Sequence, residues 1–74
     1  MPFRAGKCLL RSRLKQARLT QTELANRLNL SQQMISHYVN GRKTMSLEIA
    51  YNIAAILKCN VEDLYTWEYR NGPE

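Results

Sequence analysis

The sequence has few of the residues on which most catalytic and metal sites depend. Its 74 residues include one histidine, two cysteines and six acids. We find no Ser-His-Asp arrangement, and the wide spacing of Cys8 and Cys59 matches neither a zinc motif nor a disulfide framework. Both thiols are therefore expected to be reduced and at or near the core. We predict that the chain is not an enzyme, with no catalytic residues, no cofactor and no metal.

Long apolar runs are also absent. No stretch approaches the roughly 18 apolar residues of a transmembrane helix. The opening "MPFRAGKCLL" lacks the long apolar region of a signal peptide and is followed by more arginines. We therefore expect no membrane contact and a cytoplasmic location.

Acids are missing where cations are most frequent. The first twenty residues contain no acid, whereas six cations occur there: Arg4, Lys7, Arg11, Arg13, Lys15 and Arg18. The net charge is +5 and the isoelectric point is about 9.6, which favours an anionic partner. A solvated helix face is an equally good explanation of the charge alone. So short a chain has room for one core, and we expect one domain over 1–74, with its core at about 7–67 and a tail at 68–74.

Start and stop signals predict five short helices and no strand, hence an all-α fold. The first runs from about Lys7 to Ala17. Caps at Thr20, Ser31, Ser46 and Asn60 begin the others. Glu23 completes a capping box with Thr20, and Asn29 and Gly41 end the second and third helices. Leu47 is placed in the apolar stripe of the fourth helix, and the final "NGPE" is expected to fray.

The third helix has two unlike sides. Advancing about 100° per residue, five polar uncharged side chains fill an arc of about 140°: Gln32, Gln33, Ser36, His37 and Asn40. Apolar side chains fill the opposite arc: Met34, Ile35, Tyr38 and Val39. A face of amides, hydroxyl and imidazole is suited to reading hydrogen-bond patterns, although these residues could also simply be exposed.

Only about three residues, 29–31, join the second and third helices, which is helix-turn-helix spacing. With "LTQTELANRLNLSQQMISHYVNGRK" and the later "SLEIAYNIAAILKCNVEDLY", the chain resembles the phage repressor and Cro-like helix-turn-helix family, often called the XRE family. The "TQTELA" stretch and the paired glutamines are most similar to the repressor and Cro of phage 434. The resemblance implies a compact five-helix, lambda-repressor-like DNA-binding domain.

The resemblance also implies roles for individual residues. It places the following side chains at DNA: Lys15, Gln21, Thr22, Gln32, Gln33, Ser36, His37, Asn40, Arg42 and Lys43. Gln32 and Gln33 match base-reading positions, whereas Gln21 and the loop of Arg42 and Lys43 match phosphate contacts. Two features depart from the pattern, since the usual glycine between the first two helices is absent and Met45 stands where many members have proline.

These observations predict a sequence-specific regulator that binds double-stranded DNA, a repressor or Cro-like protein that is bacterial or phage-encoded and nucleoid-associated. One recognition helix reads only a few base pairs, so we expect a homodimer on a palindromic operator. Its apolar contact is placed on the fifth helix and tail: Val61, Leu64, Trp67 and Tyr69. The alternative is a protein-interaction module of antitoxin or anti-repressor type with the same fold, and a protein regulator remains possible in either case.

Overall fold

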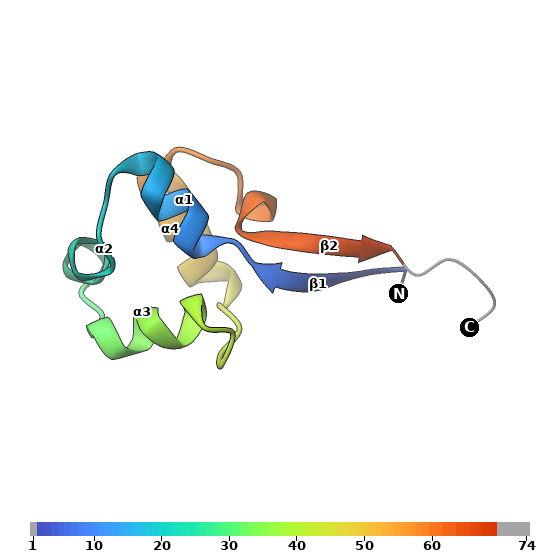
Figure 1. The fold of residues 1–74 in the computed structure, drawn as a ribbon, viewed down its shortest axis with the longest axis horizontal. Coiled ribbons are helices and arrows are strands. Elements are labelled where there is room, and N and C mark those ends of the chain that lie inside the picture. The colour runs from blue at the N-terminus through green and yellow to red at the C-terminus, as the bar shows by residue number, and fades with distance from the viewer. Residues whose placement is uncertain (1, 70–74) are drawn as a thin grey trace.

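The helices occur in the predicted order, but two strands flank them. The computed structural model describes residues 2–69, so the expected fraying of "NGPE" lies outside the described residues. Figure 1 shows, in chain order, β1 (Phe3–Cys8), α1 (Leu10–Ala17), α2 (Gln21–Leu28), α3 (Gln32–Val39), α4 (Leu47–Leu57), the 3₁₀ turn η1 (Val61–Leu64) and β2 (Tyr65–Tyr69).

The prediction of an all-α fold with five helices is wrong in part. Lys7 and Cys8, expected in the first helix, belong to β1, and the fifth helix is only the four-residue turn η1. β1 and β2 pair antiparallel in a two-stranded sheet. Glu68 and Tyr69, expected in the tail, are part of β2. The structure is therefore mostly helical, with four α-helices and one small sheet.

Three of the four predicted caps, those at Thr20, Ser31 and Ser46, form as expected, whereas Asn60 begins only the 3₁₀ turn η1. The hydroxyl oxygens of Thr20, Ser31 and Ser46 accept hydrogen bonds from backbone N–H groups three residues on, at 3.1, 3.1 and 3.2 Å respectively. Asn29 ends α2 in the left-handed conformation with φ 58°, and Gly41 follows α3 with φ 76°. Short-range side-chain chemistry thus sets the ends of the helices on both sides of the helix-turn-helix.

Arg18 and Met45 lie where many family members have the linking glycine and the proline that this sequence lacks. Arg18 takes the left-handed conformation after α1 with φ 58°, a position that glycine fills at lower cost. Met45 is buried, and its backbone N–H donates to the hydroxyl of Tyr65 at 3.2 Å. A proline at this position would have no N–H to donate. The loop before α4 is therefore tied to the start of β2.

The core joins all five helical elements. Each supplies one fully buried aliphatic side chain: Leu10, Leu24, Ile35, Ile53 and Leu64. One expectation fails, because Leu47, placed in the apolar stripe of the fourth helix, is 78 % exposed. Cys8 and Cys59 are half-buried free thiols. Within residues 2–69, no helix has both the length and the apolar character required to cross a membrane.

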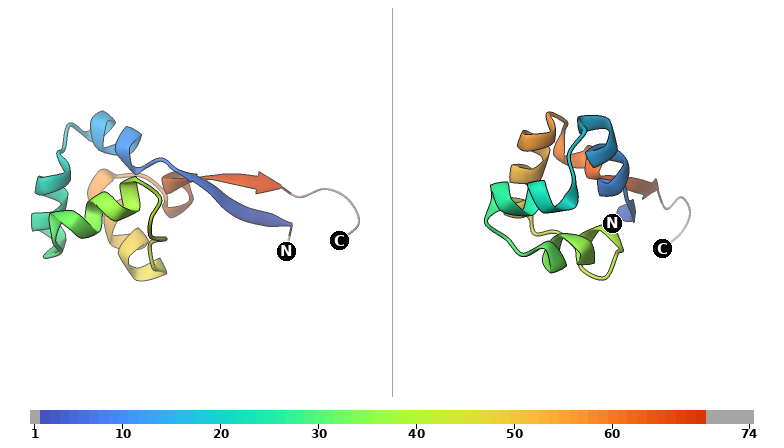
Figure 2. Two further views of the ribbon diagram at one scale, coloured as in Figure 1. Left: turned by 60° about the horizontal axis from the view of Figure 1, so that its bottom comes forward. Right: turned by 60° about the vertical axis from the view of Figure 1, so that its left-hand side comes forward.

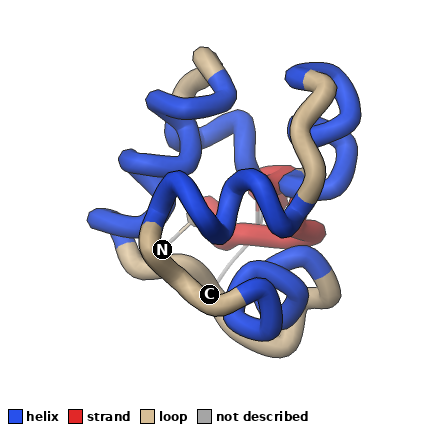
Figure 3. Tube along the Cα trace, turned by 90° about the vertical axis from the view of Figure 1, so that its left-hand side faces the viewer, coloured by secondary structure: helices blue, strands red, loops and turns tan. Residues whose placement is uncertain are grey.

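The two strands form a ribbon that projects from the helical body. Figures 1 and 2 show it as an arm along the long axis of the molecule, which measures 45 Å against 22 and 19 Å for the other two axes. Seen down this axis in Figure 3, the strands lie behind the helices. At its base, the N–H of Leu9 donates to the carbonyl of Leu64 at 2.8 Å, and that of Lys7 donates to Thr66 Oγ1 at 2.7 Å.

The capping box of α2 makes a contribution to stability that depends on pH. The backbone N–H of Thr20 donates to the Glu23 carboxylate at 2.9 Å, and this bond, helped by the Thr20 hydroxyl and Arg27, lowers the pKa of Glu23 below its ordinary 4.5. A lowered folded-state pKa gives stability that is present above the unfolded-state pKa and is lost as pH falls through the folded-state pKa. An NMR titration should therefore find the Glu23 midpoint below 4.5, and Thr20→Ala should move it upward. An unshifted midpoint in the unmodified protein would contradict the capping box.

Candidate nucleic-acid interface

The orientation of α3 is set by its link to α2 and by its packing on the core. Residues 29–31 link α2 to α3, and the carbonyl of the buried Ala25 in α2 accepts a hydrogen bond from the backbone N–H of Leu30 in this link at 2.9 Å. Ile35 and Tyr38 point into the core from α3. The opposite side of the helix, the polar face predicted from the sequence, is thereby turned outward.

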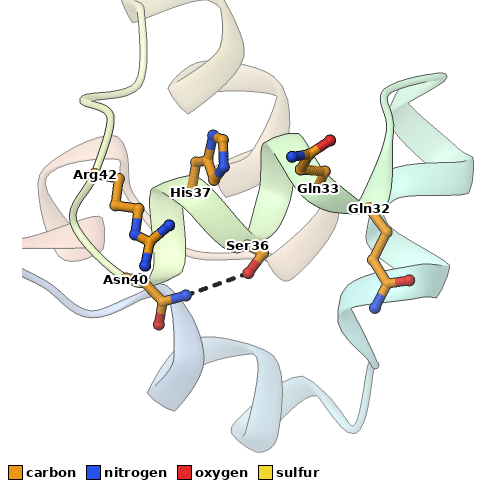
Figure 4. Close-up of a pocket in the computed structure, with 6 residues that line it drawn as sticks. All are labelled: Gln32, Gln33, Ser36, His37, Asn40 and Arg42. Carbon is orange, nitrogen blue, oxygen red and sulfur yellow. Dashed lines mark hydrogen bonds between the residues drawn. The ribbon is translucent and has the colours of Figure 1, made fainter.

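That polar face forms an open hollow. It has a volume of about 490 Å³ and is lined by six residues, all among the predicted site residues: Gln32, Gln33, Ser36, His37, Asn40 and Arg42 (Figure 4). The structure thus brings together six of the ten predicted residues. Gln32 and Gln33 are exposed in the first turn of α3, whereas Ser36 and His37 are half-buried along the helix.

Hydrogen bonds orient the far end of this hollow. The Asn40 side-chain nitrogen donates to Ser36 Oγ at 3.2 Å, and its oxygen accepts a bond from Arg11 Nη2 at 3.2 Å. The Asn40 amide is therefore held from both sides, between α3 and α1. Gln32 and Gln33 form no such bond in the close-up of Figure 4.

The loop after α3 returns beside the hollow. The backbone N–H groups of Arg42 and Lys43 both donate to the carbonyl of His37, at 2.8 and 3.3 Å. This turn, made possible by the positive φ of Gly41, puts Arg42 among the lining residues and leaves Lys43 exposed next to it. Two cations thus lie where α3 ends, beside the polar hollow.

A second hollow of about 510 Å³ adjoins the first. Asn40 lines both, and three cations line the second: Lys7, Arg11 and Lys15. No acidic residue of the described chain is among the residues that line either hollow. The predicted Lys15 therefore lies at the flank of the polar face, in a continuous basic surface.

This surface includes residues that sequence reasoning missed or left open. Lys7 was assigned to the first helix, and only its place at the end of β1 brings it beside Lys15. Arg11 and Arg13 are both among the six cations of the first twenty residues, and the sequence does not distinguish them. Arg13 donates to the carbonyl of Asp63 at 3.0 Å and so braces η1. Arg11, by contrast, lines the basic hollow.

The other predicted residues lie at the beginning of α2. Gln21 is half-buried and Thr22 is exposed in its first turn. Both lie outside the six residues that line the polar hollow. Their predicted contact with DNA, which for Gln21 is with a phosphate, therefore depends on DNA that extends past the start of α3.

Comparison with known proteins decides the family. A family model described as helix-turn-helix matches residues 10–64, most of the chain. The chain belongs to the Cro/C1-type helix-turn-helix family. The match includes α1 to η1 and excludes both strands, so the ribbon lies outside the part that defines this helix-turn-helix protein.

Relatives of similar length support the assignment. A SPbeta prophage-derived uncharacterized HTH-type transcriptional regulator, YopS, from Bacillus subtilis is 38 % identical over 64 residues, covering 85 % of this chain and 86 % of its own. Two uncharacterized HTH-type transcriptional regulators from Archaeoglobus fulgidus are 32 % and 30 % identical over 63 residues, covering 80 % of this chain and 89 % and 90 % of theirs.

Proposed function

We propose that this protein is a sequence-specific regulator of transcription, a repressor or Cro-like protein, that inserts α3 into the major groove of double-stranded DNA. The observation that carries the proposal is the polar hollow: six side chains with hydrogen-bonding groups line one outward side of α3. The adjoining hollow adds three cations without an acid. Family membership and the names of the relatives agree with it.

The chemistry of the hollow matches base edges better than phosphate alone. A B-DNA major groove is about 12 Å wide and admits one α-helix. A glutamine amide offers one acceptor and two donors, so Gln32 or Gln33 can pair with the N6 and N7 groups of adenine. Lys15, Arg42 and Lys43 at the flanks fit the backbone, where contacts position the protein without reading sequence.

The proposal includes two copies of the chain on a palindromic operator. One α3 has eight residues and reaches only a few base pairs. Two-fold pairing places the recognition helices about 34 Å apart, one turn of B-DNA. We also propose that the protein acts in the cytoplasm, at the nucleoid, as one domain without catalytic activity.

Binding should depend strongly on salt. If four cations among Lys7, Arg11, Lys15, Arg42 and Lys43 each neutralise one phosphate, log K should fall against log salt with a slope near −3 to −4 per protomer, doubled in a dimer. The cognate duplex comes from selection out of a random oligonucleotide pool. Filter binding or fluorescence anisotropy over a salt series then gives the slope.

Two neighbouring arginines provide a matched pair of variants for this experiment. Arg11→Ala should reduce the magnitude of the slope by about one, because Arg11 lies at the interface. Arg13→Ala should lower stability and leave the slope unchanged, since Arg13 bonds within the protein. A slope of zero, or failure of the pool to yield any preferred sequence, would refute the proposal and favour the protein-interaction module.

A further inference from the structure

The ribbon carries an uncovered apolar face. Phe3 pairs with Tyr69 and Ala5 pairs with Trp67 across the two strands, so all four side chains lie on one side of the sheet. The rings of Phe3 and Tyr69 are 4.9 Å apart. Phe3, Trp67 and Tyr69 are 57 %, 49 % and 60 % exposed. We call these four residues the aromatic face.

The other side of the ribbon is polar. Arg4 and Glu68 form an ion pair at 3.1 Å there, next to Gly6, where a Cβ atom would collide with Thr66 Oγ1. Small and charged residues on one side and aromatic rings on the other are the pattern of a sheet with one covered face. A two-stranded ribbon without such cover is only marginally stable in water.

The helical body covers only the base of the aromatic face. The Trp67 indole N–H donates to the carbonyl of Glu62 at 2.8 Å, which ties this ring to η1. Phe3 and Tyr69 pair at the outer end of the ribbon, since β1 begins at Phe3 and β2 ends at Tyr69. The ribbon extends beyond the helices in Figures 1 and 2. Within residues 2–69 both rings stay more than half exposed, which leaves them open to a partner.

The position of the arm indicates which partner fits. In both Figures 1 and 2 the ribbon extends on the side toward which α3 runs from its first turn to its last. Its base is next to the DNA-facing surface, because Lys7 lines the basic hollow. β2 alone spans about 17 Å at 3.4 Å per residue. Two arms together span about the 34 Å between adjacent half-sites, so arms that point toward each other can meet.

We propose that the aromatic face binds the aromatic face of a second copy of this chain, around a two-fold axis. The role of this contact at a two-fold operator rests on the proposed function. The chain carries a net charge of +5, so copies repel one another over most of their surface. The aromatic face contains no charged side chain and allows close approach.

The area determines how strong this contact is. Three aromatic side chains of roughly 150–250 Å² each, about half exposed, offer about 300 Å² per copy. The total of about 600 Å² is below the 1,200–2,000 Å² of a stable interface. The dimer is therefore weak in free solution and is fully populated only when DNA holds both copies.

This placement corrects the dimer surface expected from the sequence. Leu64 is fully buried and Val61 is half-buried against the core, so neither is available. Trp67 and Tyr69 are exposed as that expectation requires, and Phe3, which it omitted, completes the surface. The competing surface is on α4, where Leu47 and Tyr51 are 78 % and 66 % exposed. That patch has two side chains on a helix whose other side is already packed.

The test uses Phe3→Glu and Tyr69→Glu, with Tyr51→Glu as the matched control. Each change puts one carboxylate in place of an exposed ring, and a two-fold contact would bring like charges together in the first two. Sedimentation equilibrium without DNA should show a dimer whose dissociation constant rises about tenfold or more in the ribbon variants and is unchanged in Tyr51→Glu. Thermal melting controls for folding.

A DNA measurement completes the test. On a duplex with two half-sites, the ribbon variants should lose cooperative binding, while their affinity for a single half-site stays within about threefold. Cooperativity and dimerisation that survive both ribbon variants, or fail only in Tyr51→Glu, would overturn the proposal. So would a single copy bound at saturation to a two-half-site duplex. The sedimentation result is independent of DNA, so a ribbon-dependent dimer without sequence preference would refute only the proposed function.

Discussion

Gln33→Ala and Gln32→Ala should each weaken binding to the cognate duplex by about 5- to 150-fold and leave binding to a scrambled duplex nearly unchanged. A lost bidentate contact with a base costs about 1–3 kcal/mol. Both side chains line the polar hollow from the first turn of α3, where a helix entering the groove reaches deepest. Competition titrations with the two duplexes measure the ratio.

Folding should be almost unaffected by these changes. Both glutamines are exposed and lie away from the core side of Ile35 and Tyr38. Exposed helix substitutions usually change stability by less than about 0.5 kcal/mol. Thermal melting of each variant therefore separates a lost contact from a lost fold.

Lys15→Ala is the contrasting variant. Lys15 lines the basic hollow beside α3 and not the polar one. Its loss should weaken cognate and scrambled binding alike, because a phosphate contact carries no sequence information. If both glutamine variants fold normally and retain full cognate preference, α3 has been wrongly assigned as the recognition helix.

Ile35→Ala should lower the free energy of unfolding by about 2–5 kcal/mol, the cost of emptying a fully buried aliphatic site. Ile35 is 0 % exposed and comes from the same helix as the glutamines. A chain of this length is stable by roughly 4–11 kcal/mol. The variant therefore loses a large part of its stability, and a urea titration followed by circular dichroism measures the loss.

A smaller change at the same position provides the control. Ile35→Val removes one methylene group and should cost about 0.5–1.5 kcal/mol. Cognate affinity, measured where each variant is still folded, should stay close to that of the parent, since this side chain faces the core. A stability loss in Ile35→Ala no larger than that of Ile35→Val would mean that α3 is not packed as described.

The polar face of α3 was predictable because its signals are local. Caps such as Thr20 with Glu23 act over three residues. The polar side of α3 follows from the helical periodicity of side chains within nine residues, 32–40. The family match confirms the helix-turn-helix to which these signals point. The alternation in Tyr65, Trp67 and Tyr69 was also present, but it was assigned to a fifth helix and a tail.

The sequence by itself determined the caps, the helix-turn-helix and the polar face, since each depends on neighbours within one or two turns. Only the tertiary structure decided the ribbon, because Arg4 and Glu68 are 64 positions apart and no local pattern pairs them. It also decided that Arg11 faces the basic hollow while Arg13 bonds to Asp63. Two arginines on one short helix look alike in sequence, and they differ only in what the folded chain places beside them.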